Sequence, residues 1–159
     1  MNKQKGFSLI ELLIVVAIIL IIAAIAIPNL MRSRMAANES SAVGSIRTIN
    51  TAQVTYSTTY PTIGFTGTLT VLGGAASACS SGASSTVACL IDDVLAKGTK
   101  SGYKFTIGGT TGTPAVTYTS NATPQSAGQS GQRTFCSDQS GVIYNDPQGG
   151  ACTNASTPL

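Results

Sequence analysis

The stretch from Phe7 to Met31, FSLIELLIVVAIILIIAAIAIPNLM, decides how the rest of this chain is interpreted. Its last twenty residues, Leu12 to Met31, contain no charged side chain. A helix of that length, at about 1.5 Å of rise per residue, crosses roughly one bilayer core. One carboxylate, Glu11, stands at the start of the apolar run. A charge at the edge of an apolar helix is costly, so Glu11 requires a partner or an aqueous edge.

Two general interpretations fit this segment. Lys3 and Lys5 before an apolar run, with small residues ending at Ala26, are typical of a secretory signal peptide. Cleavage after Ala26 would then release a soluble exported binding domain. The second interpretation is a plain membrane anchor with its lysines in the cytoplasm. Arg32 and Arg34 argue against the anchor, because they place equal basic charge at the other end of the helix.

The string Gly6-Phe7-Ser8-Leu9-Ile10-Glu11, followed at once by the Leu/Ile/Val/Ala run, resembles the type IV prepilin motif. Type IV pilins and the pseudopilins of type II secretion share this motif, and the glycine, the aromatic residue and the glutamate all fall at the family's offsets. The resemblance implies that residues 1–6 are a leader peptide. It implies that a prepilin peptidase cuts after Gly6 and methylates the new amino group of Phe7, so that the apolar helix is retained.

The same resemblance implies a role for Glu11, which would pair with the amino terminus of a neighbouring subunit during assembly. Opposite charges in an apolar filament core attract each other far more strongly than in water, so the pair would reward correct register. Pro28 removes one backbone hydrogen bond and is predicted to kink or loosen the helix. It resembles a proline of many type IV pilins, in which the helix melts just upstream.

Residues 32–58 are predicted to continue the helix with one apolar face, since apolar residues recur at every third or fourth position. Arg32, Arg34, Glu39 and Arg47 fall away from this stripe and predict a solvated face. Tyr60-Pro61 ends the helix. The stripe consists of Met35, Ala42, Ile46, Ile49 and Tyr56, flanked by Val43 and Val54.

Residues 59–159 form the predicted globular head. Its first part, Thr62 to Thr86, is rich in Gly, Ser, Thr and Ala and predicts a loop, with a short strand near Thr68 to Leu72. A short helix is expected at about 87–97, because Val87, Leu90, Ile91, Val94 and Leu95 share one side and Lys97-Gly98 supplies a basic last turn and a C-cap. The acidic pair Asp92-Asp93 predicts an exposed, solvated face in preference to a cation site.

Three or four antiparallel strands are predicted at about 102–144, separated by turn residues at Gly108-Gly109, 126–131 and 138–141. One apolar face of this sheet would lie on the stripe of the long helix. The tail from Asn145 to Leu159 is expected to be an irregular C-terminal loop. The strands are expected at residues 102–107, 115–120, 132–136 and 141–144, with Tyr103, Phe105, Val116, Tyr118 and Phe135 as core candidates.

Four cysteines, Cys79, Cys89, Cys136 and Cys152, lie outside the apolar segment. On an exported chain they indicate two disulfides, and three pairings are possible. Pairing of neighbours in sequence is favoured, because each bond would close a loop that has few apolar residues to hold it. A metal site is not predicted, since the chain has no histidine and no C-x-x-C spacing.

Composition gives no indication of catalysis or of a cofactor. With 9% charged residues, no histidine and no phosphate-binding glycine motif, the chain lacks the parts of a nucleophilic or acid–base site. Its formal charge of +3 falls to +1 once Lys3 and Lys5 leave, so nucleic acid is not an indicated partner. The sequence therefore predicts a structural protein and not an enzyme.

The layout as a whole also resembles the type IV pilin fold, an α+β fold in which a long N-terminal helix packs against a small antiparallel β-sheet head. The resemblance implies a major type IV pilin, first held in inner-membrane lipid and then polymerised with itself into an extracellular pilus. Prepilin peptidase and an inner-membrane assembly platform would be its other partners. A type II secretion pseudopilin, which forms a short periplasmic fibre, is the alternative within the same family.

Overall fold

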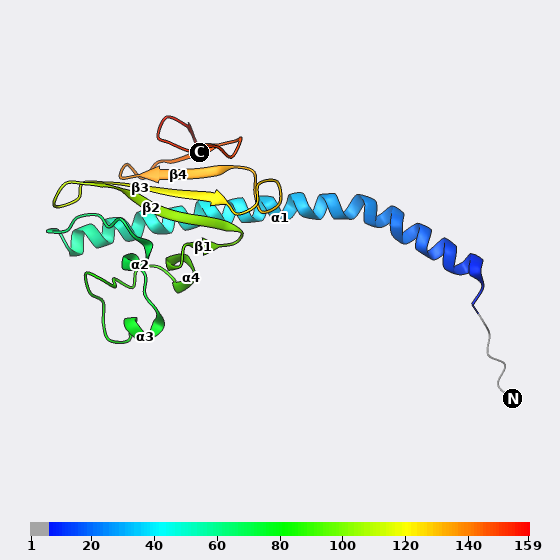
Figure 1. Cartoon of the computed structure of the whole chain (residues 1–159), viewed down its shortest axis with the longest axis horizontal. Coiled ribbons are helices and arrows are strands. Elements are labelled where there is room, and N and C mark those ends of the chain that lie inside the picture. Colours follow the sequence, from blue (N-terminus) through cyan, green and yellow to red (C-terminus); the bar gives the residue numbers. More distant parts are fainter. Residues whose placement is uncertain (1–6) are drawn as a thin grey trace. The chain divides into compact units, whose positions relative to one another are not determined.

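The computed structural model describes residues 7–159, so the predicted leader peptide lies outside the described residues. The chain divides into two compact units, Met1–Arg34 and Met35–Leu159. The longest helix, α1 (Leu9–Thr59), contributes to both of them and continues through Pro28 as helix (Figure 1). It ends immediately before Tyr60-Pro61, as the sequence predicts. The predicted kink at Pro28 stays a prediction.

The described part of the first unit is a helix with no core of its own. Between Phe7 and Arg34 every residue is exposed except Ala23, which is half-buried. By length and composition, this helical segment is long enough and apolar enough to cross a membrane. No residue of its most apolar 18-residue stretch is buried within the protein. Its large apolar side chains are therefore left uncovered by the rest of residues 7–159 and require lipid or protein around them.

The second unit contains one antiparallel sheet of six strands in the order β1-β2-β3-β4-β5-β6. Each strand pairs with its neighbours in sequence, so the sheet is a simple meander (Figure 1). β2, β3 and β4 form its centre. The strands are β1 (Thr99–Lys100), β2 (Tyr103–Thr111), β3 (Thr117–Pro124), β4 (Thr134–Asp138), β5 (Ile143–Asp146) and β6 (Thr157–Pro158).

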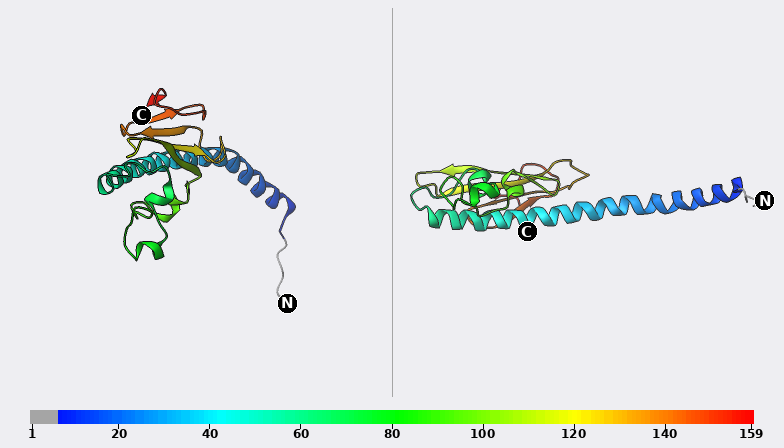
Figure 2. Two further views of the ribbon diagram at one scale, coloured as in Figure 1. Left: turned by 60° about the vertical axis from the view of Figure 1, so that its left-hand side comes forward. Right: turned by 90° about the horizontal axis from the view of Figure 1, so that it is seen from below.

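The core of this unit lies between the sheet and the part of α1 that follows Met35 (Figure 2). Alternate residues of the central strands point to the helix, and Tyr103, Tyr118 and Phe135 are essentially buried. The predicted stripe on α1 is confirmed by the burial of Ala42, Ile46, Ile49 and Tyr56. Two predictions are wrong: Val54, expected to flank the stripe, is 54% exposed, and Val116, expected in the core of the sheet, is 63% exposed. Val116 lies just before β3, outside the strand that would have turned it inward.

Three short helices complete the unit: α2 (Leu69–Leu72), α3 (Ala76–Cys79) and α4 (Asp93–Ala96). The expected strand at Thr68 to Leu72 is wrong, because this segment turns into α2 and buries Leu69 and Leu72 together. Side chains three residues apart share one face of a helix but not one face of a strand.

The expected helix at 87–97 forms only in its last turn, α4. In a helix the Ile91 N–H would donate to the Val87 carbonyl, but here it donates to the Leu72 carbonyl at 3.3 Å, and the Val87 carbonyl accepts the Ser84 N–H at 2.8 Å. Cys89 between them has a φ of 56°, in the left-handed region, which a right-handed helix excludes. A helix begins only at Asp92, whose carboxylate accepts the Leu95 backbone N–H and caps it.

The strands differ from the prediction at both edges and at one expected turn. Gly108-Gly109 lies within β2 and not in a turn, and the register between β2 and β3 shifts after Gly108. Gly109 has a φ of 65°, and a Cβ there would lie 2.9 Å from the Thr119 hydroxyl oxygen, so glycine permits the irregular pairing. β1 and β6 were not predicted, and β6 places part of the expected irregular tail in the sheet.

The structure pairs Cys79 with Cys89 and Cys136 with Cys152, the pairing of neighbours in sequence. The first bond closes the loop that contains α3. The second ties the C-terminal tail to the outer face of β4, opposite α1. Both bonds therefore hold segments that contribute little to the core.

Glu39 corrects the prediction of a solvated face. Its carboxylate accepts the backbone N–H groups of Gln132 and Arg133 at 2.9 and 3.2 Å, and it forms an ion pair with the Arg133 guanidinium at 2.9 Å. Its side chain is only 12% exposed. Arg32, Arg34 and Arg47 are exposed as predicted. Glu39 thus fastens α1 to the turn between β3 and β4.

Candidate assembly segment

The first turn of α1 is built around Ser8 and Glu11. The Ser8 backbone N–H donates to Oε2 of Glu11 at 2.9 Å, and the Leu12 N–H reaches the Ser8 carbonyl at 3.2 Å. In a capping box, the side chain of a glutamate at the third helical position accepts the backbone N–H of the residue before the helix. The bond from Ser8 to Glu11 is this half of a capping box. The first-turn carboxylate also lies where the helix dipole favours negative charge. Glu11 therefore helps to start the helix within its own chain.

The bond from the Ser8 backbone N–H to Glu11 was not predicted, although the spacing Ser-x-x-Glu before an apolar run is its sequence signal. Phe7, the predicted first residue of the mature chain, is 83% exposed and lies next to this turn. Gly6, the other half of the predicted cleavage site, lies outside the described residues. The structure thus places Phe7, Ser8 and Glu11 together at one end of α1.

Glu11 is the sole charged residue between Phe7 and Met31. Its carboxylate is exposed, and within residues 7–159 it has one hydrogen bond, from the Ser8 backbone N–H. A carboxylate accepts several hydrogen bonds, so Glu11 keeps the capacity to accept a cation as well. Around it, Leu9, Leu12, Leu13 and nearby apolar residues would supply an environment of low dielectric once they are covered, in which an opposite charge binds strongly.

The head contains ionisable groups that serve its folding. Burial raises the pKa of the Tyr118 phenol to about 12, and its hydroxyl donates to the Asn50 side chain at 3.0 Å. The hydrogen bond from Lys100 lowers the pKa of Asp92, against the effect of its partial burial. Asp92 and Asp93, predicted to be merely solvated, each pair with a lysine, Lys100 and Lys97 respectively. These are surface ion pairs beside a helix cap.

The part of the chain that the structure describes offers no set of side chains that could hold a metal ion. No group of three or more His, Cys, Asp or Glu side chains lies together within residues 7–159. The four cysteines are paired in disulfides.

Comparison with known proteins bears on the N-terminal segment. Residues 1–27 match the family described as "Prokaryotic N-terminal methylation motif". The chain is 60% identical over 40 residues to the "Type IV wide pilus major component PilA4" of Thermus thermophilus, and 46% identical over 54 residues to the "Type IV major pilin protein PilA" of Myxococcus xanthus. It is also 37% identical over 51 residues to the "Type II secretion system core protein G" of Escherichia coli.

These matches cover 25%, 34% and 32% of this chain, and 30%, 24% and 35% of the three relatives. The matched segments thus span about a third or less of each relative's length. No solved structure matches the chain. The long helix, antiparallel sheet and two disulfides are nevertheless consistent with the α+β fold of type IV pilins. The beginning of this chain is a type IV prepilin motif, of the kind that type IV pilins and a type II secretion protein carry.

Proposed function

We propose that this chain is the precursor of a major type IV pilin, a structural subunit that polymerises with itself into an extracellular filament. The observation that carries the proposal is the first half of α1, whose apolar side chains are exposed from Phe7 to Met31 apart from one half-buried alanine. Such a surface is stable only in lipid or against other copies of the same helix. Lipid would cover it in the inner membrane, and neighbouring helices would cover it in the filament.

Glu11 would select the register of assembly. Cleavage after Gly6 would create an amino group on Phe7, four residues before the carboxylate. When a neighbouring subunit brings its own amino group to Glu11, both charges leave water together, and the apolar surroundings strengthen their attraction. A subunit out of register would leave an unpaired charge among apolar side chains, which costs several kcal/mol by general estimates.

The partners and locations follow from this proposal. Prepilin peptidase would remove residues 1–6 and methylate Phe7 at the cytoplasmic face of the inner membrane. An assembly platform in that membrane would then move subunits into the growing pilus. The similarity to pilins of Thermus thermophilus and Myxococcus xanthus supports this role over an enzymatic one.

A pseudopilin of type II secretion is the second candidate. The similarity to the Escherichia coli secretion protein supports it, since the matched segment has about the same length as in the pilins. The head favours a surface pilin, because two disulfides and a polar head suit a subunit that leaves the periplasm. A pilus extends outside the cell, whereas a pseudopilin fibre stays in the periplasm. Recovery of the protein in material sheared from the cell surface would therefore favour the pilin.

The processing step is tested by the intact mass and the N-terminal sequence of the sheared protein. A chain that begins at Phe7 and is heavier by one methyl group is expected. In Gly6→Val the full-length chain should accumulate in the membrane. A chain that begins at Ile27 would instead mean that an ordinary signal peptidase discards the helix and releases a soluble domain, and the proposal would fall.

The assembly step is tested with Glu11→Gln, which keeps the shape of the side chain and removes its charge. Normal processing is expected, with sheared filaments reduced at least tenfold. The matched control is Asp93→Asn, which changes an acid on the exposed surface of the head and should leave filament yield unchanged. Filaments of Glu11→Gln at control yield would refute the role of the charge.

A further inference from the structure

The ion pairs of the second unit leave some of its charged side chains unpaired. The carboxylates of Glu39, Asp92 and Asp93 each hold a cation of the same unit. Only 9% of the chain is charged, so the remaining charges can be compared one by one. Within residues 7–159, the charged residues of this unit outside the ion pairs are Arg47, Lys104, Asp138 and Asp146.

Arg47 lies beside a hollow of about 310 Å³ on the surface of α1, called here the Arg47 hollow. Threonines of α1 line it from one side, and Leu90 closes it from the other. The Leu90 backbone N–H donates to the Leu72 carbonyl at 2.7 Å, which holds this wall in place. The hollow therefore has a fixed shape and one cation at its edge.

The threonines of the Arg47 hollow limit what it can bind. The hydroxyls of Thr48, Thr51 and Thr55 each donate to the carbonyl four residues earlier, at 3.1, 3.0 and 3.0 Å. Having donated their hydrogen, these oxygens can only accept. A phosphate would find one donor group, the guanidinium, beside oxygens that repel it. The hollow instead suits a partner that brings a carboxylate to Arg47 and N–H donors to the threonines.

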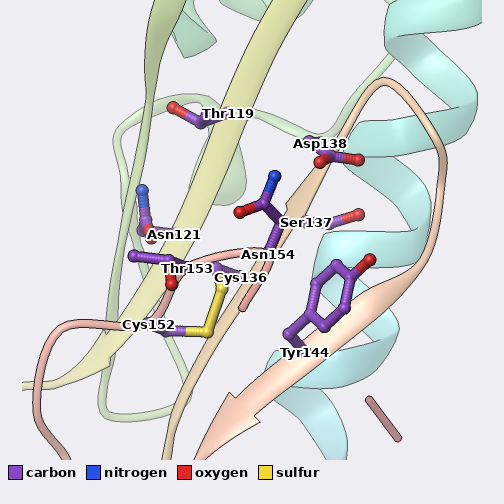
Figure 3. A pocket seen from close by; sticks show the side chains of 9 residues that line it. All are labelled: Thr119, Asn121, Cys136, Ser137, Asp138, Tyr144, Cys152, Thr153 and Asn154. Carbon is purple, nitrogen blue, oxygen red and sulfur yellow. A yellow bond between two sulfur atoms is a disulfide. The ribbon is translucent and has the colours of Figure 1, made fainter. Parts of the chain in front are cut away.

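The turn between β4 and β5 carries both of these groups. Asp138 ends β4, at the rim of a hollow on the outer face of the sheet (Figure 3). Its Oδ1 accepts the backbone N–H and the hydroxyl of Ser140 at 2.9 and 2.6 Å, whereas Oδ2 has no hydrogen bond within residues 7–159. Gln139 is exposed and follows directly, and its amide offers two N–H donors.

This turn is held in shape within its own subunit. The Gly141 N–H donates to the Asp138 carbonyl at 3.0 Å, and the Gly141 carbonyl accepts the Asn50 side chain of α1 at 3.5 Å. The Ser137 hydroxyl donates to the Val142 carbonyl at 2.8 Å. A surface that is already ordered loses less conformational entropy when it binds.

The Arg47 hollow and the turn lie on opposite sides of one ridge of α1. Thr51 and Thr55 line the Arg47 hollow and also a second hollow, which Gln139 and Gly141 line from the other side. A contact between two different surfaces of identical subunits leaves one of each surface free. It therefore repeats from copy to copy, and it builds a filament when the ring does not close.

We propose that the turn at residues 138–142 of one subunit docks into the Arg47 hollow of a second copy of this chain. The Asp138 carboxylate pairs with Arg47, and the Gln139 amide donates to the threonine hydroxyls. The contact rests on the proposed function and adds to it an interface between heads. It uses the second unit alone, whereas Glu11 acts in the first, so the two are separately testable.

The test reverses each charge and measures the yield of sheared filaments. Arg47→Glu and Asp138→Arg should each lower the yield about tenfold or more, because like charges then face each other at every contact. The double variant should restore it. Co-expression of the two single variants should also restore it, since one supplies two acids and the other two cations, and alternating copies pair them. An ion pair within one chain would not be restored by co-expression.

Lys104→Glu and Asp146→Arg are the matched controls, because they make the same charge changes at the other two unpaired residues and should keep the original yield. Near-ultraviolet circular dichroism verifies that each variant remains folded. Asp138→Asn keeps an acceptor for Ser140 and should still lower the yield, which separates the loss of charge from damage to the turn.

The contact is overturned if Arg47→Glu or Asp138→Arg gives the original yield, or if the controls lose as much. Failure of co-expression to restore filaments overturns it as well. If the original chain forms no filaments, the proposed function falls and the contact falls with it.

Discussion

Replacing Gln53 with alanine should lower the free energy of unfolding of the head more than replacing a surface glutamine with alanine does. Gln53 lies on α1 with no exposed surface, and its side-chain amide bonds to both backbone groups of one residue, as the backbone of a neighbouring strand would. Its Nε2 donates to the Thr66 carbonyl at 2.7 Å, and its Oε1 accepts the Thr66 backbone N–H at 3.0 Å. Thr66 itself is 7% exposed, so water cannot replace these bonds freely.

The alanine variant leaves both backbone groups of Thr66 without partners. A buried donor or acceptor that loses its partner costs about 1–3 kcal/mol. Two such groups, less a few tenths gained from the helix propensity of alanine, predict a loss of about 2–5 kcal/mol in the free energy of unfolding. At about 4 °C per kcal/mol for a head of this size, the midpoint of thermal unfolding should fall by roughly 8–20 °C.

The assay is unfolding of the full mature chain in detergent with its disulfides intact, followed by near-ultraviolet circular dichroism. The chain has five tyrosines and no tryptophan, and all five tyrosines lie between Tyr56 and Tyr144. The near-ultraviolet signal therefore reports side-chain packing in the head. Gln139→Ala is the control, since Gln139 is exposed and should change the midpoint little. Equal midpoints for the Gln53 and Gln139 variants would refute the inference that this side chain braces the loop.

Glu39 predicts a dependence on pH. Burial alone would raise its pKa, but the backbone N–H groups of Gln132 and Arg133 and the Arg133 guanidinium outweigh that effect, so its pKa is lowered in the folded state. Its stabilisation is therefore complete above the unfolded value near 4.5 and is lost as the pH falls through the folded pKa. Glu39→Gln should cost about 1 kcal/mol at pH 7 and flatten the acid limb of the unfolding midpoint; an unchanged limb would contradict this. Replacing Cys136 and Cys152 together with serine opens a loop of sequence separation 16 and should lower stability by about 3 kcal/mol, measured by urea unfolding against the disulfide-intact chain; an unchanged midpoint would contradict a restraining role.

Features that depend on neighbouring residues could be predicted from the sequence. The prepilin motif, the charge-free run after Glu11 and the stop of α1 at Tyr60-Pro61 all follow from short-range chemistry: charge, hydropathy and the missing N–H of proline. The apolar stripe of residues 32–58 was predictable for the same reason, since its period is that of the helix itself. The central strands were found within a few residues, because they alternate.

Features that depend on residues far apart in the sequence could not be predicted from it. Glu39 follows the pattern of a solvated residue, and its partners stand 93 and 94 positions away in the chain. The expected helix at 87–97 fails at its start because the Ile91 N–H and the Val87 carbonyl, which a helix would join, bond instead to Leu72 and Ser84. Similarly, Asn121, Cys136 and Tyr144 lie side by side only because β3, β4 and β5 pair in one register. Local composition determined the apolar helix and its motif, whereas contacts between residues far apart in the sequence decided the turns and the long-range hydrogen bonds of the head.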